Sequence, residues 1–283
     1  MESRVEFLLK SLHNINKISN EEWMASLEER KLKELEFHDS RRKDKNLQEV
    51  DSYEKYYGNK KYYTTVNSSR KYMLEWIEKN APGKVFLDYA CGNGEKAIYA
   101  AQCGAKLSIG IDISSVSIDN ARKAAEENGV KDNIFFCQGD AENTKLPDRS
   151  IDTILCSGML HHLDLSYAFP EMRRILAPDG KILAIEALGY NPLIQLYRNL
   201  TPQMRTEWEK HHILNFDDLK FAKRFFNIGD IKFWHILAYI AAHIPFALAP
   251  LNALDHILTK IPGLRLMAWI FTFELLSKES SIK

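Results

Sequence analysis

The stretch VFLDYACGNGEKAIYAA, residues 85–101, decides the fold. It begins with a short apolar run that reaches an acidic residue, Asp88, passes through a Gly-x-Gly turn and then resumes a helical spacing of apolar residues. A strand, a glycine-rich turn and a helix in this order place bare backbone N–H groups and the positive end of a helix dipole around one point. The stretch therefore predicts a binding site for an anionic group at the turn.

Short apolar runs recur after this stretch and alternate with segments of helical periodicity that end at glycine. Such runs are typical of strands buried on both faces, and the alternation predicts a doubly wound, mostly parallel α/β sheet with its ligands at the carboxyl ends of the strands. We expect seven strands in a Rossmann-like sheet, with a polar loop between two helices after the fifth. The expected strands are residues 84–90, 106–112, 133–140, 151–158, 181–187, 228–240 and, near the edge, 266–278.

The chain divides by composition into three parts. Residues 1–65 are highly charged in their first 57 positions and carry only a narrow apolar stripe, which favours a helical N-terminal cap that adds nothing to the core. Residues 66–187 contain the strand and helix alternation and are the expected α/β core. Residues 188–283 are expected to supply acceptor-side helices, a hydrophobic insertion and the last strands of the same domain.

Charge and cysteine content exclude several classes of function. The 38 basic and 38 acidic residues balance, so net charge gives no reason to expect a nucleic acid partner. The four cysteines never occur in a C-x-x-C spacing, which argues against a zinc site and a disulfide framework, and we predict no metal. The N-terminus lacks a secretory signal pattern, so we expect a cytoplasmic protein with reduced thiols.

Residues 233–254 contain no Asp, Glu, Lys or Arg, and their length raises the question of a membrane span. His235, His243, Asn252 and two prolines favour a buried or interfacial helical insertion instead. The hypothesis is a peripheral membrane contact through residues 233–273. A homodimer interface or packing onto the sheet is the alternative interpretation.

Two acids narrow the identity of the ligand at the turn. Asp88 would oppose a diphosphate but could accept a hydrogen bond from an ammonium group, and Asp112, at the end of the second strand, could accept from both hydroxyls of a ribose. S-adenosylmethionine has an amino acid at one end and a nucleoside at the other. The spacing of Gly92, Gly94 and Ala97 also satisfies G-x-G-x-x-A, so an NAD(P)-dependent oxidoreductase stays open.

From about residue 60 to 187 the sequence resembles the class I S-adenosylmethionine-dependent methyltransferases, in particular the branch that acts on small molecules, quinones and lipids. The resemblance rests on LDYACGNG, GIDIS, QGDAENTKLPDRSIDTILCSGMLHHL and MRRILAPDGKILAIEA, in this order. One departure is Ala90, where the family usually has glycine. A methyltransferase-fold regulator without activity is a further alternative, although the intact acids and glycines of the motifs argue against it.

The resemblance implies S-adenosylmethionine as cofactor and assigns positions to its parts. Ala90, Gly92 and Gly94 would line the methionine part with Asp88 near the ammonium, and Asp112 would hold the ribose. The adenine would lie between Ile113, Asp140 and Ala141, the sulfonium above Cys156 and Ser157, and Tyr63, with Tyr62, across the cofactor. The activity implied is in-line methyl transfer to a small-molecule or lipid-like acceptor.

Candidate residues for the acceptor side follow from their chemistry. If the acceptor is a hydroxyl, a nearby base assists, and the candidates are His161, His162 and His211, with His212 beside the last. Arg205 is a candidate contact for an anionic acceptor. Glu186, at the end of the fifth expected strand, is a candidate to face the site.

Overall fold

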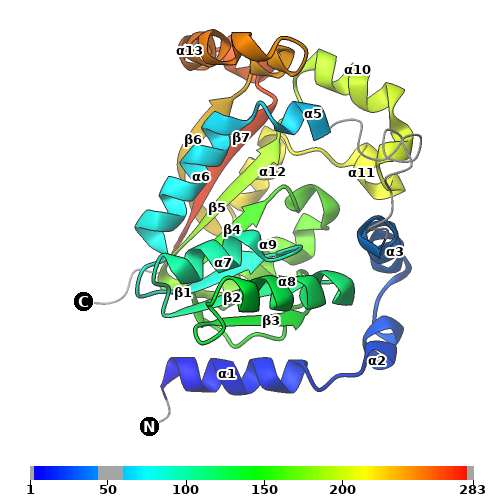
Figure 1. Cartoon of the computed structure of the whole chain (residues 1–283), viewed down its shortest axis with the longest axis vertical. Helices are drawn as coiled ribbons and strands as arrows, with labels where there is room; N and C mark the ends of the chain where they lie inside the picture. Colours follow the sequence, from blue (N-terminus) through cyan, green and yellow to red (C-terminus); the bar gives the residue numbers. More distant parts are fainter. Residues whose placement is uncertain (1–2, 44–59, 279–283) are drawn as a thin grey trace.

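The computed structural model describes residues 3–43 and 60–278, and it contains one seven-stranded sheet with helices on both faces (Figure 1). The strand order is β3-β2-β1-β4-β5-β7-β6, in which β1 to β5 are parallel and β7 is antiparallel to both of its neighbours. The predicted fold class is confirmed. The strands are β1 (Val85–Tyr89), β2 (Leu107–Asp112), β3 (Ile134–Gln138), β4 (Ile151–Ser157), β5 (Leu176–Ala187), β6 (Phe226–Trp234) and β7 (Ile270–Ser277).

The crossover helices confirm the predicted alternation of strands and helices, except that one helix ends earlier than predicted. They are α7 (Glu95–Gln102), α8 (Ser115–Glu127) and α9 (Leu165–Ile175). The segment LAPDG was expected to end a helix, but it begins β5, where Leu176 pairs with Ile151 beside a register shift. Pro178 lacks the N–H that a helix needs, and the strand therefore starts earlier than predicted.

The sixth strand was predicted too far along the chain. It ends at Trp234 because His235 takes a left-handed backbone conformation, with φ at 64°, which turns the chain out of the sheet. The last strand, β7, lies one position in from the edge, and β6 forms the edge itself. Three helices, rather than two, lie between β5 and β6, namely α10 (Pro192–Leu200), α11 (Glu207–His211) and α12 (Phe216–Ala222).

The apolar segment 233–254 is not one long helix. After β6 it forms the 3-10 turns η3 (Ala238–Ala242) and η4 (Pro245–Ala247), then enters α13 (Leu248–Leu258). Proline at 245 lacks a backbone donor and fits the first position of such a turn. Within the described ranges, none of the helices has the length and apolar content that crossing a membrane requires.

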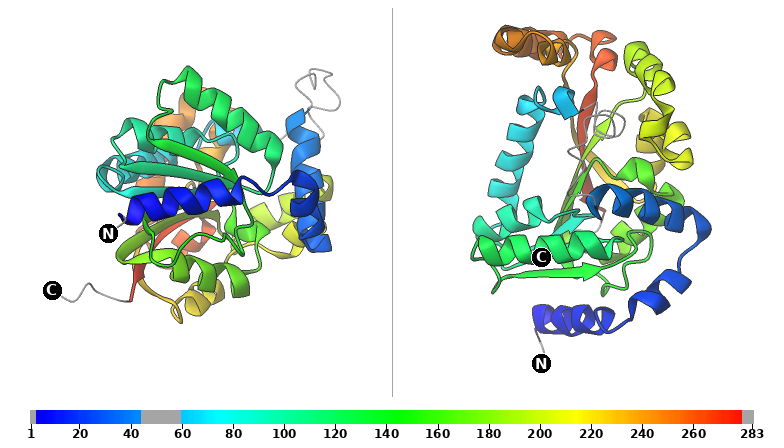
Figure 2. Two further views of the ribbon diagram at one scale, coloured as in Figure 1. Left: turned by 90° about the horizontal axis from the view of Figure 1, so that it is seen from below. Right: turned by 45° about the vertical axis from the view of Figure 1, so that its right-hand side comes forward.

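The helices that precede β1 lie against several parts of the molecule. They are α1 (Arg4–Ile15), α2 (Asn20–Ala25), α3 (Glu29–Lys43), α5 (Lys60–Tyr63) and α6 (Asn67–Asn80). Figure 2 shows α1 alongside β3. The expectation that this region adds nothing to the core is wrong, because Leu8 and Leu12 are fully buried in the main hydrophobic cluster. Residues 44–59 of the expected cap lie outside the described residues.

Candidate active site

The carboxyl ends of β1, β2 and β4 surround a cavity of about 360 Å³ that α3 covers from the side. This first cavity has the size and polarity of a site for a nucleoside-containing ligand. The structure brings most of the residues assigned to the cofactor together here. They are Ala90, Gly92, Asp112, Ile113, Asp140, Ala141 and Ser157.

The glycine turn is held to the end of β2 by Asp112. One carboxylate oxygen of Asp112 accepts the N–H of Gly92 at 2.8 Å, and the other accepts the N–H of Ser114 at 2.9 Å. A carboxylate offers about four lone-pair positions, so one carboxylate can accept several hydrogen bonds at once. Ala90 and Gly92 have φ values of 58° and 54°, which is the left-handed region that glycine adopts without strain.

Gly94 has a packing role in the turn. A Cβ atom at this position would lie 2.7 Å from Cζ of Phe136 and 2.8 Å from Cβ of Ala121, at a φ of 81°. The residue therefore allows α7 to approach β3 and α8 closely. Gly94 does not border the cavity, and its predicted contact with the methionine part stays a prediction.

Asp88 and Cys156 also lie behind the cavity wall. Asp88 is 2 % exposed and accepts the N–H of Ala97 at 3.2 Å, and burial raises the pKa of its carboxyl to about 6. Cys156 is fully buried, with its Sγ 3.7 Å from Sδ of Met172, and burial raises the pKa of its thiol. Their roles toward the cofactor remain predictions.

A lysine from α3 reaches the acidic side of the first cavity. Nζ of Lys31 lies 2.8 Å from Asp140 and 2.9 Å from Glu142. Burial alone would lower the pKa of Lys31, but these two carboxylates raise it overall. Asp140 therefore already has a cationic partner at the position predicted to bind adenine. This contact could not be predicted from the sequence, since a charged helix face normally indicates solvent exposure.

A second, larger cavity of about 910 Å³ adjoins the first. Its wall is rich in aromatic side chains from distant parts of the chain, namely Tyr62, Tyr63, Tyr99, Tyr197, Tyr239 and Trp269. Tyr63 packs against Trp269 with ring centroids 5.4 Å apart, so it lies at this cavity and not at the first one. The two cavities share His38, Glu95, Lys96, Ser157, Gly158 and His162 on their walls.

Both histidines that follow β4 have acidic partners; His162 borders both cavities and His161 borders the second. Nδ1 of His161 is 2.7 Å from Glu186, which confirms that this acid faces the site. Nδ1 of His162 is 3.1 Å from Glu34 of α3 and 3.0 Å from Glu209 of α11. Burial alone would lower the pKa of His162, but the two carboxylates raise it overall.

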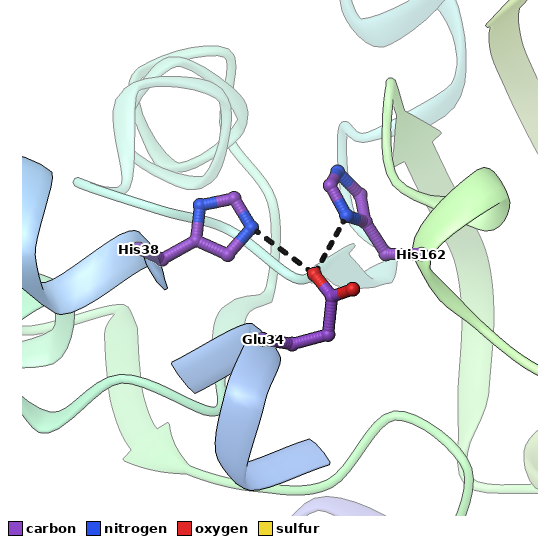
Figure 3. A group of neighbouring side chains, drawn as sticks. All are labelled: Glu34, His38 and His162. Atoms are coloured by element: carbon purple, nitrogen blue, oxygen red, sulfur yellow. Dashed lines mark hydrogen bonds and ion pairs between the residues drawn. The ribbon is translucent and has the colours of Figure 1, made fainter. Parts of the chain in front are cut away.

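The same side chains form the groups best suited to a metal ion in the described part of the chain. Glu34, His38 and His162 converge in one group, as Figure 3 shows, and His161, His162 and Glu209 in another. His38 is 3.7 Å from Glu34 through Nε2. The carboxylates of Glu34 and Glu209 favour the imidazolium form of His162, because its positive charge offsets part of theirs.

The predicted base His211 is not brought to the site. It lies exposed at the last position of α11 and borders neither cavity, and His212 stacks on Trp208 with ring centroids 3.7 Å apart. The reason is the orientation of α11, which turns Glu209 toward the histidines and the opposite face to solvent. Arg205 does line the second cavity, and Arg198 of α10, which the sequence analysis missed, lies beside it.

Comparison with known proteins identifies the central part of the chain. Residues 86–180 match a family model described as a methyltransferase domain. This segment is therefore similar to a methyltransferase domain. The matched segment contains the glycine turn, Asp112, Asp140 and both histidines after β4. The match thus confirms the resemblance found in the sequence.

Two curated relatives match part of the chain. An uncharacterised methyltransferase, YcgJ of Bacillus subtilis (strain 168), is 34 % identical over 119 residues, which are 40 % of this chain and 44 % of the relative. The 27-O-demethylrifamycin SV methyltransferase of Amycolatopsis mediterranei (strain S699) is 34 % identical over 101 residues, 35 % of this chain and 37 % of the relative. The chain therefore spans less than half of the length of these relatives.

Solved structures extend the similarity beyond the methyltransferase domain at the level of the fold. The geranyl diphosphate C-methyltransferase of Streptomyces coelicolor A3(2) superposes with a TM-score of 0.55 at 16 % identity, over 74 % of this chain and 76 % of that one. The cyclase SpnF superposes with a TM-score of 0.53 at 18 % identity, over 74 % and 81 %. One fold thus carries more than one reaction, and the site must decide the function.

Proposed function

We propose that the chain is an S-adenosylmethionine-dependent methyltransferase that transfers a methyl group to a small, lipid-like acceptor. The observation that carries the proposal is the pair of adjoining cavities, one at the glycine turn and one lined by aromatic side chains, which share the wall around Ser157 and His162. A cofactor in the first cavity would present its sulfonium end to the second. The shared residues lie where the two cavities meet. Two substrates held on either side of this junction can react without diffusing apart.

Residues of the first cavity suit the cofactor chemically. Asp112 borders the cavity with a carboxylate that can accept hydrogen bonds from ribose hydroxyls, and Gly92, which has no side chain, allows close approach of the methionine part. When bound, the cofactor supplies a sulfonium-activated methyl group, and transfer breaks the carbon–sulfur bond as the acceptor forms its bond to carbon. The protein has to align the acceptor and exclude water.

His161 is the residue placed to remove the acceptor proton. Glu186 lies at its Nδ1 and favours the tautomer that keeps the proton there, which leaves Nε2 as the basic atom. The same carboxylate stabilises the imidazolium that forms when Nε2 takes a proton. This arrangement suits an acceptor with an ionisable hydroxyl or similar group. His162 contacts both Glu34 of α3 and Glu209 of α11. These contacts hold the two helices beside the junction of the cavities.

The lipid-like character of the acceptor is proposed from the apolar surface near the second cavity. On α10, Leu193 is 60 % and Leu200 71 % exposed, and Leu193 also borders the cavity. On η4 and α13, Phe246 is 89 % and Ile257 59 % exposed. Figure 1 and the right view of Figure 2 place α10 and α13 at the same end of the molecule. We propose that this end contacts a membrane, from which the acceptor enters.

The cofactor part of the proposal is tested by calorimetric titration of the chain with S-adenosylmethionine and S-adenosylhomocysteine, with NAD as control. Micromolar binding of the first two and none of NAD supports it. Binding of NAD alone would establish the oxidoreductase alternative, and no binding at all would favour the regulator. Sedimentation with anionic and neutral vesicles, together with light scattering of the free chain, separates membrane contact from a homodimer at α10 and α13.

A further inference from the structure

Two arginines lie side by side on the wall of the second cavity. Arg198 lies near the end of α10, and Arg205 follows the 3-10 turn η2 (Pro202–Met204). Nη1 of Arg205 donates to the carbonyl oxygens of Thr201 at 2.8 Å and Arg198 at 3.3 Å. Nη2 of Arg198 donates to the backbone oxygen of Glu209. These contacts fix both guanidinium groups but use only one nitrogen of each.

Neither guanidinium has a carboxylate within ion-pair distance among residues 3–43 and 60–278. The nearest acid in their network is Glu209, whose carboxylate is engaged by Nδ1 of His162 at 3.0 Å and by the N–H of Thr206 at 2.8 Å. Burial and the charge of Arg205 lower the pKa of Arg198 to about 10, and burial lowers the pKa of Arg205 as well. Two half-buried cations without an anionic partner are costly to keep together.

The rest of the cavity wall shows what surrounds these cations. Tyr62 packs edge-on against Tyr197, and Met73, Ile194 and Trp269 add apolar surface. His161 and Glu186, which the proposed function uses for proton removal, line the same cavity. A ligand that satisfies this wall has an apolar body and a negative charge.

We propose that Arg198 and Arg205 bind an anionic group of the methyl acceptor, a carboxylate or a phosphate, and hold it while the other end meets the cofactor. Planar guanidinium groups with free N–H donors match both anions in a two-pronged geometry. This inference rests on the proposed function, because it assigns the second cavity to the acceptor. It specifies an anionic acceptor, whereas the aromatic residues of the cavity alone indicate only an apolar one.

The experiment uses probes of one chain length that differ only in the head group. The full chain, saturated with S-adenosylhomocysteine, is titrated calorimetrically with decanoate, decyl phosphate, decanol and decyltrimethylammonium, each in monomeric solution. We expect decanoate or decyl phosphate to bind at least about tenfold more tightly than decanol, and the cation not to bind. The tighter of the two anions assigns the head group as carboxylate or phosphate.

Variants then test the two arginines directly. Arg198→Gln and Arg205→Gln should each lower the affinity for the anionic probe by about tenfold or more and leave decanol unchanged, while Arg224→Gln, outside both cavities, should change neither. Thermal unfolding checks that each variant is folded. If one is not, the head-group preference of the wild-type chain decides alone.

The outcomes separate this inference from the proposed function. Equal binding of decanol and both anions, preference for the cation, or failure of every probe with a chain that binds S-adenosylhomocysteine would overturn the anion site and leave the methyltransferase proposal standing. Anion binding that the two glutamine variants abolish, in a chain that fails to bind S-adenosylhomocysteine, would support the site and contradict the methyltransferase proposal.

Discussion

Oε2 of Glu186 lies 2.7 Å from Nδ1 of His161, and Oε1 of the same carboxylate accepts the backbone N–H groups of Met159 and Leu160. Glu186 belongs to β5, whereas the other three residues follow β4, so one side chain links two neighbouring strands at their carboxyl ends. It is 2 % exposed. The position of the candidate base therefore depends on an acid that has little access to solvent.

Glu186→Gln is expected to destabilise the chain and to disorient His161. Glutamine keeps the shape of the side chain but has no negative charge. Its NH₂ group must replace one of the two carboxylate oxygens, so it faces either the N–H groups of Met159 and Leu160 or Nδ1 of His161. Loss of hydrogen bonds to a buried charged group costs about 2–3 kcal/mol, measurable by urea unfolding. Exposed Glu126→Gln is the control. An unfolding free energy equal to the wild type would contradict the role given to Glu186.

Asp112→Ala is expected to weaken binding of S-adenosylhomocysteine by roughly 1–3 kcal/mol, because it removes ribose acceptors and also releases the Gly92 N–H from the turn. Isothermal titration measures the affinity. Asp119→Ala, on the exposed side of α8, serves as the matched control and should bind as the wild type does. Unchanged affinity in Asp112→Ala would refute the ribose position.

Much of the sheet could be predicted because its central strands are buried on both faces. Such strands appear in sequence as continuous apolar runs, and β1, β2 and β4 match the predicted ranges closely. The end of β6 could not be predicted, because it depends on the left-handed conformation of His235, which sequence periodicity does not encode.

The candidate site could be predicted where a short motif contains both the turn and the residue expected to contact the ligand. Gly92 and Asp112 are examples. The site was not predictable where the partner comes from a distant helix. Lys31 and Glu34 lie on a charged helix whose polar face usually indicates solvent, yet Glu34 meets His162 across 128 positions of sequence. Likewise, periodicity could not decide whether α11 turns Glu209 or His211 inward.

Adding a methyl group at Gly94 and removing one at Ala90 are expected to change the free energy of unfolding in opposite directions. Gly94→Ala forces Cβ to within 2.7 Å of Phe136 at a positive φ, so we expect a loss of at least about 2 kcal/mol in unfolding free energy. Ala90→Gly relieves a left-handed alanine and should stabilise the chain by about 0.5–1 kcal/mol, after the added freedom of the unfolded state is subtracted. Urea denaturation of both variants measures the pair. Two variants of equal stability would show that the turn is not held in this conformation.

Asp88 is expected to make stability depend on pH between about 4 and 6. Burial raises the pKa of its carboxyl from 3.8 to about 6, so the folded chain binds more protons than the unfolded chain in this window. Stability should therefore fall as pH rises from about 4 to about 6 and stay level above, by on the order of 2–3 kcal/mol in total from this group.

Replacing Asp88 by asparagine isolates this contribution. Asp88→Asn keeps an oxygen for the N–H of Ala97 but cannot ionise. It should be more stable than the wild type at pH 7–8, and the difference should shrink toward zero near pH 4, since the wild-type carboxyl is then protonated in the folded state. Urea unfolding at several pH values measures the difference, with exposed Asp132→Asn as control. A difference between Asp88→Asn and the wild type that stays constant across this range would mean that Asp88 is not desolvated at the end of β1.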